Sequence, residues 1–219
     1  MRNDRGGTRA MQRAMRTMEL RIINGHYQLR YSQRLNLQQL HAVLHHQGRL
    51  YNGRPTMLSC RMMGKRVQFF PNGTIQVLAG NMTPLDFVRL RGMIREQLTT
   101  YSSVNAAAAT PALIQLSTWN VNNIVVYFNL SSTYNFNGIL CSAHVSYEPE
   151  LFPALLLAKW ATARVTLFPN GKGIVTGVRS LFQAMTVLRH VLADVKHWRR
   201  RPRQGHARAR DRGGDDDLH

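Results

Sequence analysis

Few residues in this chain have the types and spacing that catalysis or metal binding requires. His41 and His45 lie four residues apart, so a helix would bring both imidazoles to one face, where they can bind zinc. No cysteine or glutamate nearby completes a ligand set, which favours a polar helix face. Glu148 and Glu150 are closely spaced carboxylates, but Pro149 between them is typical of an extended or turn segment. We therefore predict no metal site, no cofactor and no enzymatic activity.

The charge of the chain indicates a polyanionic partner instead. The 219 residues include 29 Lys+Arg against 11 Asp+Glu, which gives a formal net charge of +18. Such an excess is most often found in proteins that bind nucleic acid, and less often in those that bind an acidic membrane surface. No apolar run reaches the roughly 18–20 residues of a membrane-spanning helix. Two cysteines are too few for a disulfide framework, so a reducing compartment is expected.

Several aromatic residues stand beside predicted turns, where a large ring is often exposed. Phe70 and Phe168 each precede Pro-Asn-Gly, a turn sequence because Asn and Gly accept positive φ. Phe152 precedes Pro153 near another chain reversal. Rings that project from a sheet edge beside basic residues can wedge between DNA base steps. The residues alone do not decide between two roles for these rings: insertion between DNA base steps, or simply covering the edge of the core.

Both turns belong to an internal repeat, which supplies the elements that position these rings. Phe-Pro-Asn-Gly at 70–73 recurs at 168–171, an offset of 98 residues. Each copy is followed by a β-rich segment that ends in glycine and then by an amphipathic stretch, at 83–99 and 179–197. Asn24 and Asn123, 99 residues apart, each end an apolar-alternating strand. The pattern predicts that each unit contains a strand, a helix, several antiparallel strands and a long helix.

This repeat divides the chain into five segments. We expect a basic flexible arm at 1–18, a first repeat at 19–100, a connector at 101–116, a second repeat at 117–198 and a disordered tail at 199–219. The two units should share contacts, because a small sheet alone would leave a bare edge. The Arg-rich tail is either a solubility tail or a non-specific DNA arm or nuclear-localisation signal.

The second unit resembles the TATA-binding protein family. Residues 146–153, Ser-Tyr-Glu-Pro-Glu-Leu-Phe-Pro, look identical to the signature of that family's second repeat. The spacing Phe-x-x-Gly-Lys-x-x-x-Thr-Gly at 168–177 looks like the family's turn and strand, and Asn-Asn-Ile-Val at 122–125 resembles its central strand. The resemblance covers roughly residues 20–198.

The first unit is similar to the family more loosely. Asn24, Tyr51-Asn52 and Phe70-x-x-Gly73 fall where the family has its symmetric asparagine, its Tyr-Asn and its hairpin turn. In place of the family's next phenylalanine stand Thr56 and Met57, and Met57 is the residue able to act as a substitute wedge. The sequence also has His26 for a groove-facing valine and Ala79 for a threonine. We therefore expect the protein to bind DNA asymmetrically, with a stronger wedge in the second repeat than in the first.

The resemblance implies an α+β fold, a pseudo-symmetric saddle of two tandem repeats. Its antiparallel ten-stranded sheet would carry helices on the convex face and a DNA minor groove on the concave face. The family is itself a standard example of minor-groove kinking by inserted side chains. The implied DNA-binding residues are the donors Asn24 and Asn123, the wedges Phe70, Phe152 and Phe168, and the groove-lining Val77, Val125, Ile174 and Thr176, for which ordinary strand packing is the alternative. The implied phosphate contacts are Arg54, Arg61, Lys65, Arg164 and Lys172.

The same resemblance implies a role in transcription initiation. Glu148 and Glu150 resemble the acidic loop through which the family engages a IIB-type initiation factor, so RNA polymerase machinery and A·T-rich promoter DNA are the expected partners, in the nucleus or at a site of viral transcription. Two alternatives remain: a saddle-fold scaffold that has lost specific DNA bending, and a single-strand binder that stacks bases on its exposed rings. High net charge predicts steep salt dependence under all three.

Overall fold

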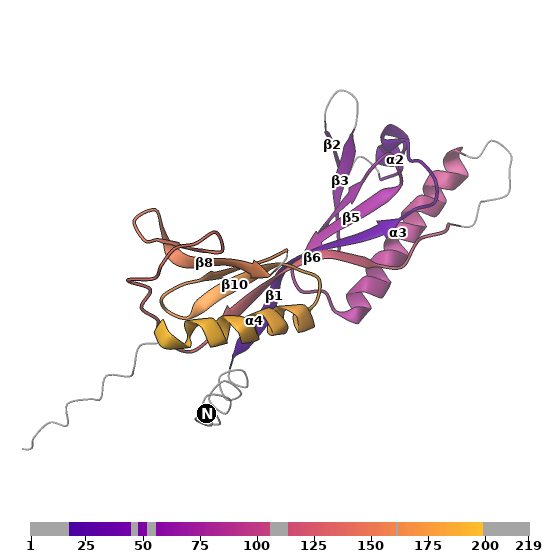
Figure 1. Ribbon diagram of the computed structural model, residues 1–219. Helices are drawn as coiled ribbons and strands as arrows, with labels where there is room; N and C mark the ends of the chain where they lie inside the picture. The colour runs from indigo at the N-terminus through magenta and orange to yellow at the C-terminus, as the bar shows by residue number, and fades with distance from the viewer. Residues whose placement is uncertain (1–17, 45–47, 52–55, 106–113, 161, 199–219) are drawn as a thin grey trace, which may run out of the picture.

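The computed structural model describes residues 18–44, 48–51, 56–105, 114–160 and 162–198. The strands in these residues form one ten-stranded antiparallel sheet. The strand order is β2-β3-β4-β5-β1-β6-β10-β9-β8-β7, so β1 and β6 lie side by side at the centre (Figure 1). The strands are β1 (Glu19–Arg30), β2 (Gly48–Tyr51), β3 (Met57–Met62), β4 (Lys65–Phe69), β5 (Thr74–Ala79), β6 (Asn120–Asn129), β7 (Val145–Glu148), β8 (Phe152–Trp160), β9 (Ala163–Leu167) and β10 (Lys172–Val178).

The helices cover one face of this sheet. They are α2 (Leu37–Val43), α3 (Pro84–Asn105), α4 (Leu181–Val195) and the short 3₁₀ helix η1 (Lys196–Trp198). Figure 1 shows α3 and α4 on the same side, one under each half, and the opposite face open. The predicted α+β saddle is confirmed, with five strands in each half. None of the described helices is long and apolar enough to cross a membrane.

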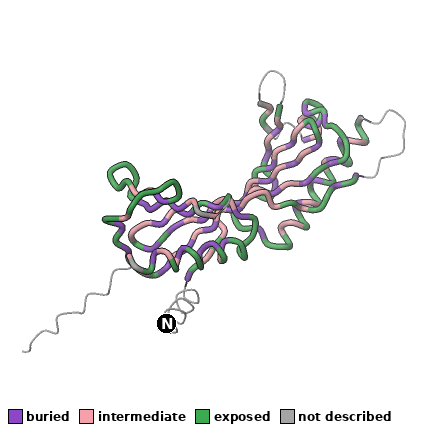
Figure 2. Tube along the Cα trace, viewed as in Figure 1, coloured by how far each residue is buried: buried purple, intermediate pink, exposed green. Residues whose placement is uncertain are grey.

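The two faces of the sheet follow from the period of two along each strand. In β5, Ile75, Val77 and Ala79 are buried, whereas the residues between them are half-exposed. In β6, Ile124, Val126 and Phe128 are buried against the helices in the same alternating way, visible as alternating colours in Figure 2. The buried set forms one continuous core, to which α3 contributes Leu90, Ile94 and Leu98, and α4 contributes Ala184, Leu188 and Val191. None of the described helices therefore covers the open face.

The two Pro-Asn-Gly turns have nearly the same geometry. Phe70 N donates to Thr74 O at 2.9 Å and Phe168 N donates to Lys172 O at 2.9 Å, which closes each hairpin. Gly73 and Gly171 have φ of 81° and 82°, in the left-handed region that glycine adopts without strain. Each turn is held from outside as well, since Tyr31 N donates to the Gly73 carbonyl and Leu130 N donates to the Gly171 carbonyl.

Two elements differ from the sequence prediction. The first long helix continues to Asn105, beyond the expected 83–99 and into the proposed connector. The second unit has no helix at 130–144, where the first has α2. In that segment Ser131 and Gly138 adopt positive φ, and Tyr134 and Phe136 are buried with their rings stacked 6.1 Å apart. Turn residues and two anchoring rings thus replace the capped helix of the first repeat. Residues 1–17 of the arm, the whole tail and residues 106–113 of the connector lie outside the described residues.

A capping box begins α3, and it makes the stability of this helix sensitive to acid. Thr83 N donates to Asp86 Oδ2 at 2.9 Å and Asp86 N donates to Thr83 Oγ1 at 3.2 Å, while Pro84 occupies the first helical position. The hydrogen bonds from Thr83, followed by the charges of Lys65 and Arg89, lower the pKa of Asp86.

A carboxylate with a lowered folded-state pKa stabilises the fold above its unfolded pKa, and this contribution is lost as the pH falls through the folded value. Asp86→Asn should therefore lower the melting temperature at neutral pH and reduce its decline between about pH 5 and 2, the range in which such carboxylates titrate. Thermal unfolding of both proteins from pH 7 to pH 2 checks this. Parallel curves across the whole range would contradict it.

Candidate nucleic-acid interface

The centre of the open face is built by two β-bulges related by the repeat. In the pairing of β1 with β6, the register shifts between Ile22 and Asn24 and again between His26 and Tyr27. On the two sides of the centre, Asn24 pairs with Val125 and His26 pairs with Asn123. A bulge re-aims a side chain without ending the strand. The predicted asparagines therefore lie on adjacent strands, one from each repeat.

Hydrogen bonds orient the amides of both asparagines. Asn24 Oδ1 accepts from Gly25 N at 2.9 Å, and Asn123 Oδ1 accepts from Gly177 N at 3.0 Å. With the oxygens held by the backbone, each side chain presents its Nδ2 group as the donor. A·T pairs show acceptors in the minor groove, so a donor pair at the centre of the face is chemically suited to them.

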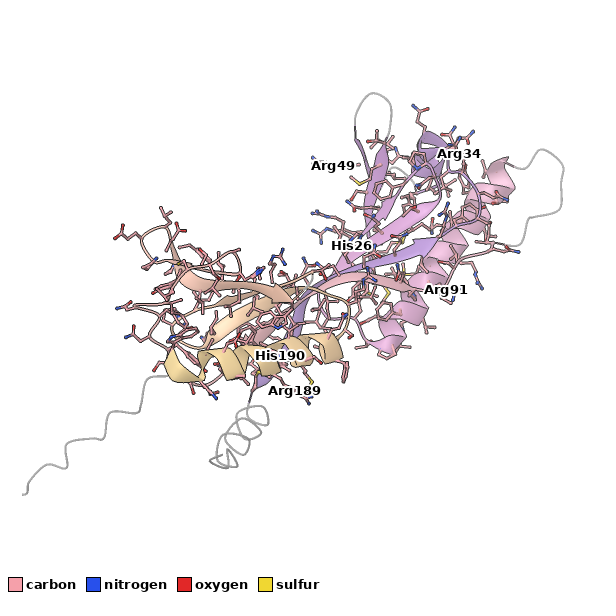
Figure 3. All side chains as sticks on the ribbon, viewed as in Figure 1. His26, Arg34, Arg49, Arg91, Arg189 and His190 are labelled. Atoms are coloured by element: carbon pink, nitrogen blue, oxygen red, sulfur yellow. The ribbon has the colours of Figure 1, made fainter. Side chains whose placement is uncertain are left out.

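His26 breaks the symmetry at this centre. It occupies the position related by the repeat to Val125, and its Nε2 atom is buried without a hydrogen-bond partner among the described residues. Figure 3 shows His26 near the middle of the sheet, whereas the labelled Arg91, Arg189 and His190 belong to the helices on the other side. A buried polar atom without a partner is uncommon in proteins, because its desolvation is not offset. This nitrogen is therefore an unused polar group at the centre of the candidate interface.

The second-repeat rings lie together at one end of the open sheet. Phe152, at the start of β8, is 43% exposed, and Phe168, just after β9, is half-buried. Their ring centroids are 5.8 Å apart and their planes are inclined by 66°, an edge-to-face pair. One exposed ring is thus supported by a second, as a rigid wedge requires.

The first-repeat end is different. Phe70 is half-buried in the equivalent turn, and the described residues place no second ring against it. Thr56 is exposed and Met57, which starts β3, is half-exposed. The structure thus brings one phenylalanine and a flexible methionine to this end, where the second repeat has two rings.

One predicted groove residue lies on the wrong face. Val125, Ile174 and Thr176 are half-exposed on the open face, but Val77 is fully buried among core residues. The segment from Gly73 to Gly80 is one residue longer than that from Gly171 to Gly177, and a shift of one residue moves a strand side chain to the opposite face. Counting from the turn glycines instead gives Gln76 and Leu78 as the counterparts of Ile174 and Thr176.

The predicted phosphate contacts also need correction. Arg61, Arg164 and Lys172 are exposed, and Arg61 and Arg164 lie on the open face. Lys65 alternates with Arg66 and so shares the side of the buried Val67, where its charge acts on Asp86. The basic residue that β4 presents on the open face is Arg66, paired with Arg61 and equivalent to Arg164 at the repeat offset of 98. That offset could have identified it. Arg54 lies outside the described residues.

The acidic pair lies at the opposite edge from β2, beside the second-repeat wedge. Glu148 and Glu150 are exposed, and Ser146 Oγ donates to Glu148 Oε1 at 3.4 Å. Leu151 beside them is 81% exposed and Leu140 is 90% exposed. Acidic and apolar side chains thus project together from this end. Nowhere in the described parts of the chain do three His, Cys, Asp or Glu residues gather as they would around a metal ion.

Taken together, the fold and this face define a two-repeat saddle protein with two central asparagines and a pair of rings on the face that the described helices leave open. Residues 118–197 match the family model described as transcription factor TFIID, or TATA-binding protein (TBP). The structure is similar to Methanococcus jannaschii TBP with a TM-score of 0.64 and 19% sequence identity, over 82% of this chain and 99% of that chain. No curated protein gives a significant sequence match. The chain therefore has the TBP fold, and its second repeat resembles the TBP family.

Proposed function

We propose that this protein binds A·T-rich promoter DNA through the minor groove, bends it and recruits transcription machinery. The observation that carries the proposal is the supported wedge: Phe152 packed against Phe168 at one end of a helix-free sheet. Exposure of this ring to water is unfavourable, and in this position the ring would be able to enter a base step. The match of residues 118–197 to the TBP family supports the same conclusion.

The centre and flanks of the face support the proposal independently. Asn24 and Asn123 present amide donors where A·T pairs present acceptors, and Val125 and Ile174 leave no partner for the guanine amino group. Arg61, Arg66 and Arg164 lie on the open face, where they would contact phosphates on either side of an opened groove.

The acidic end would serve the second part of the function. Glu148 and Glu150, with the exposed Leu140 and Leu151, form a surface that combines charge with apolar area. We propose that it contacts a IIB-type initiation factor and, through it, RNA polymerase machinery, in the nucleus or at a site of viral transcription. If DNA bending has been lost, the same surface supports the alternative function, an interaction scaffold.

A fluorescence-energy-transfer titration tests the proposal. An A·T-rich duplex labelled at both ends should be bound tightly and its ends drawn together, whereas a G·C-rich duplex of equal length should be bound more weakly without that change. Equal, salt-sensitive binding to both duplexes with no distance change would contradict minor-groove bending. A preference for single strands would instead indicate stacking on the exposed rings.

A further inference from the structure

Polar side chains form a row across the first-repeat half of the open face. Strand pairing aligns Ser59 with Gln68, Gln68 with Gln76, Gln76 with Gln28, and Gln28 with Asn120. The row therefore crosses β3, β4, β5, β1 and β6 in one line. All five side chains are half-exposed or exposed. At its central end, Asn122 Nδ2 donates to Gln28 Oε1 at 2.8 Å and Asn120 Nδ2 donates to Asn122 Oδ1 at 2.9 Å.

The equivalent row of the second repeat has a different chemistry. Pairing aligns Leu156 with Thr166, Thr166 with Ile174, Ile174 with Tyr127, and Tyr127 with Arg21. The Arg21 guanidinium lies 4.7 Å above the Tyr127 ring, and Leu156 is 41% exposed. Where the first repeat has Gln68 and Gln76, the second has Thr166 and Ile174 at the offset of 98 residues. The same fold thus presents amides on one half and mainly apolar groups on the other.

This difference matters at the floor of a minor groove. A·T and T·A pairs both present acceptors there, and a G·C pair adds the guanine amino group as a donor. Against an apolar surface that amino group loses its water without gaining a partner, which penalises the base pair. A carboxamide supplies both an acceptor and a donor, so it can satisfy the amino group of a G·C pair and the acceptors of an A·T pair.

We infer that the two repeats read different halves of the DNA site, the second requiring A·T pairs and the first accepting G·C pairs through Gln28, Gln68 and Gln76. This inference rests on the proposed minor-groove binding. It gives the protein a defined direction on DNA, since a mixed site places its G·C-containing half under the first repeat.

The direction can be measured with a dye on Cys141. The chain has two cysteines; Cys141 is exposed at the second-repeat end, whereas Cys60 is buried and its desolvation raises the pKa of its thiol to about 11. Maleimide labelling at neutral pH therefore places a donor dye on Cys141. An acceptor dye goes on one or the other end of three duplexes: all A·T at the site, G·C pairs in one half, and G·C pairs in both halves.

We expect the mixed duplex to be bound within about threefold of the all-A·T duplex, and the doubly substituted duplex at least about tenfold more weakly, as one or two unfavourable base pairs produce. On the mixed duplex, energy transfer from Cys141 should be high when the acceptor is on the end next to the A·T half, and low when it is on the end next to the G·C half. Failure to bind even the all-A·T duplex would contradict the proposed function itself. Binding of the all-A·T duplex without any orientation on the mixed one would overturn this inference alone.

Reciprocal variants connect the effect to the row. Gln68→Thr with Gln76→Ile gives the first repeat the residues of the second, and should raise the preference for the all-A·T over the mixed duplex about tenfold. Thr166→Gln with Ile174→Gln should do the opposite, allowing G·C pairs under both halves and abolishing orientation on the mixed duplex. Either pair tests the row if the other fails to fold. Unchanged affinity ratios in a folded variant would overturn the assignment.

Discussion

Replacing Phe152 and Phe168 by alanine is expected to weaken binding to an A·T-rich duplex by about 30- to 20,000-fold and to abolish the approach of its ends. Base–aromatic contacts contribute about 1–3 kcal/mol each by alanine substitution, so two rings together correspond to about 2–6 kcal/mol, at tenfold per 1.4 kcal/mol. The two rings contact each other with their centroids 5.8 Å apart, so the double variant removes the whole pair. Titration with end-labelled duplex gives both readouts.

The repeat provides the matched control. Phe70→Ala removes the ring from the equivalent turn, where the described residues provide no second ring to complete a wedge. We expect a loss of no more than about tenfold and a residual bend at the second-repeat end. Similar losses in the two variants would show that the ends contribute equally. Thermal unfolding of each variant must remain cooperative, because Phe168 is half-buried and its loss also removes packing.

Gly171→Ala is expected to lower the free energy of unfolding by about 2–4 kcal/mol, the second large effect. The left-handed backbone of Gly171 costs a Cβ-bearing residue about 1–2 kcal/mol. An added Cβ would also collide with the Ser132 carbonyl oxygen, a backbone atom that is not free to move aside. This turn carries Phe168, so DNA bending should decline with stability. Urea unfolding monitored by circular dichroism measures the change.

Gly64→Ala separates the two causes. Gly64 has φ of 72°, but an added Cβ there meets nothing within 4 Å. Its alanine variant should lose only about 1–2 kcal/mol, the conformational part alone. If the two variants lose the same amount, the close approach of Ser132 has no energetic role and the turn is held by its backbone conformation only.

The sequence predicted the fold well because its signals are local and repeated. Two Phe-Pro-Asn-Gly turns and two asparagines at matching offsets identified the tandem units, and the structure has hairpins and central strands at these places. The absent second-unit helix could also have been noticed, since 130–144 is rich in Ser, Asn and Gly rather than in helical periodicity. What the repeat could not supply was the length of each loop. Loop lengths differ between the units even where the elements correspond.

The errors at the site arise from loop length and from strand period. The segment from Gly73 to Gly80 has one residue more than that from Gly171 to Gly177, and Val77 lies on the buried side. The strand period puts Lys65 on the side of the buried Val67 and the adjacent Arg66 on the open face. The difference between the amide row of the first repeat and the mainly apolar row of the second depends on the register of five paired strands. No local sequence pattern contains that register.

The turns at 70–73 and 168–171 are each hydrogen-bonded to the end of a central strand, so a force on either turn acts on β1 or β6. The turn that carries Phe70 is bonded to Tyr31, next to the end of β1, and the turn that carries Phe168 is bonded to Leu130, next to the end of β6. A strand of 12 residues at about 3.3 Å per residue spans about 40 Å. A force on Phe70 or Phe168 is thus transmitted along β1 or β6 to Asn24 and Asn123 at the centre of the sheet. In the proposed complex, the DNA between the two turns would therefore deform rather than the sheet.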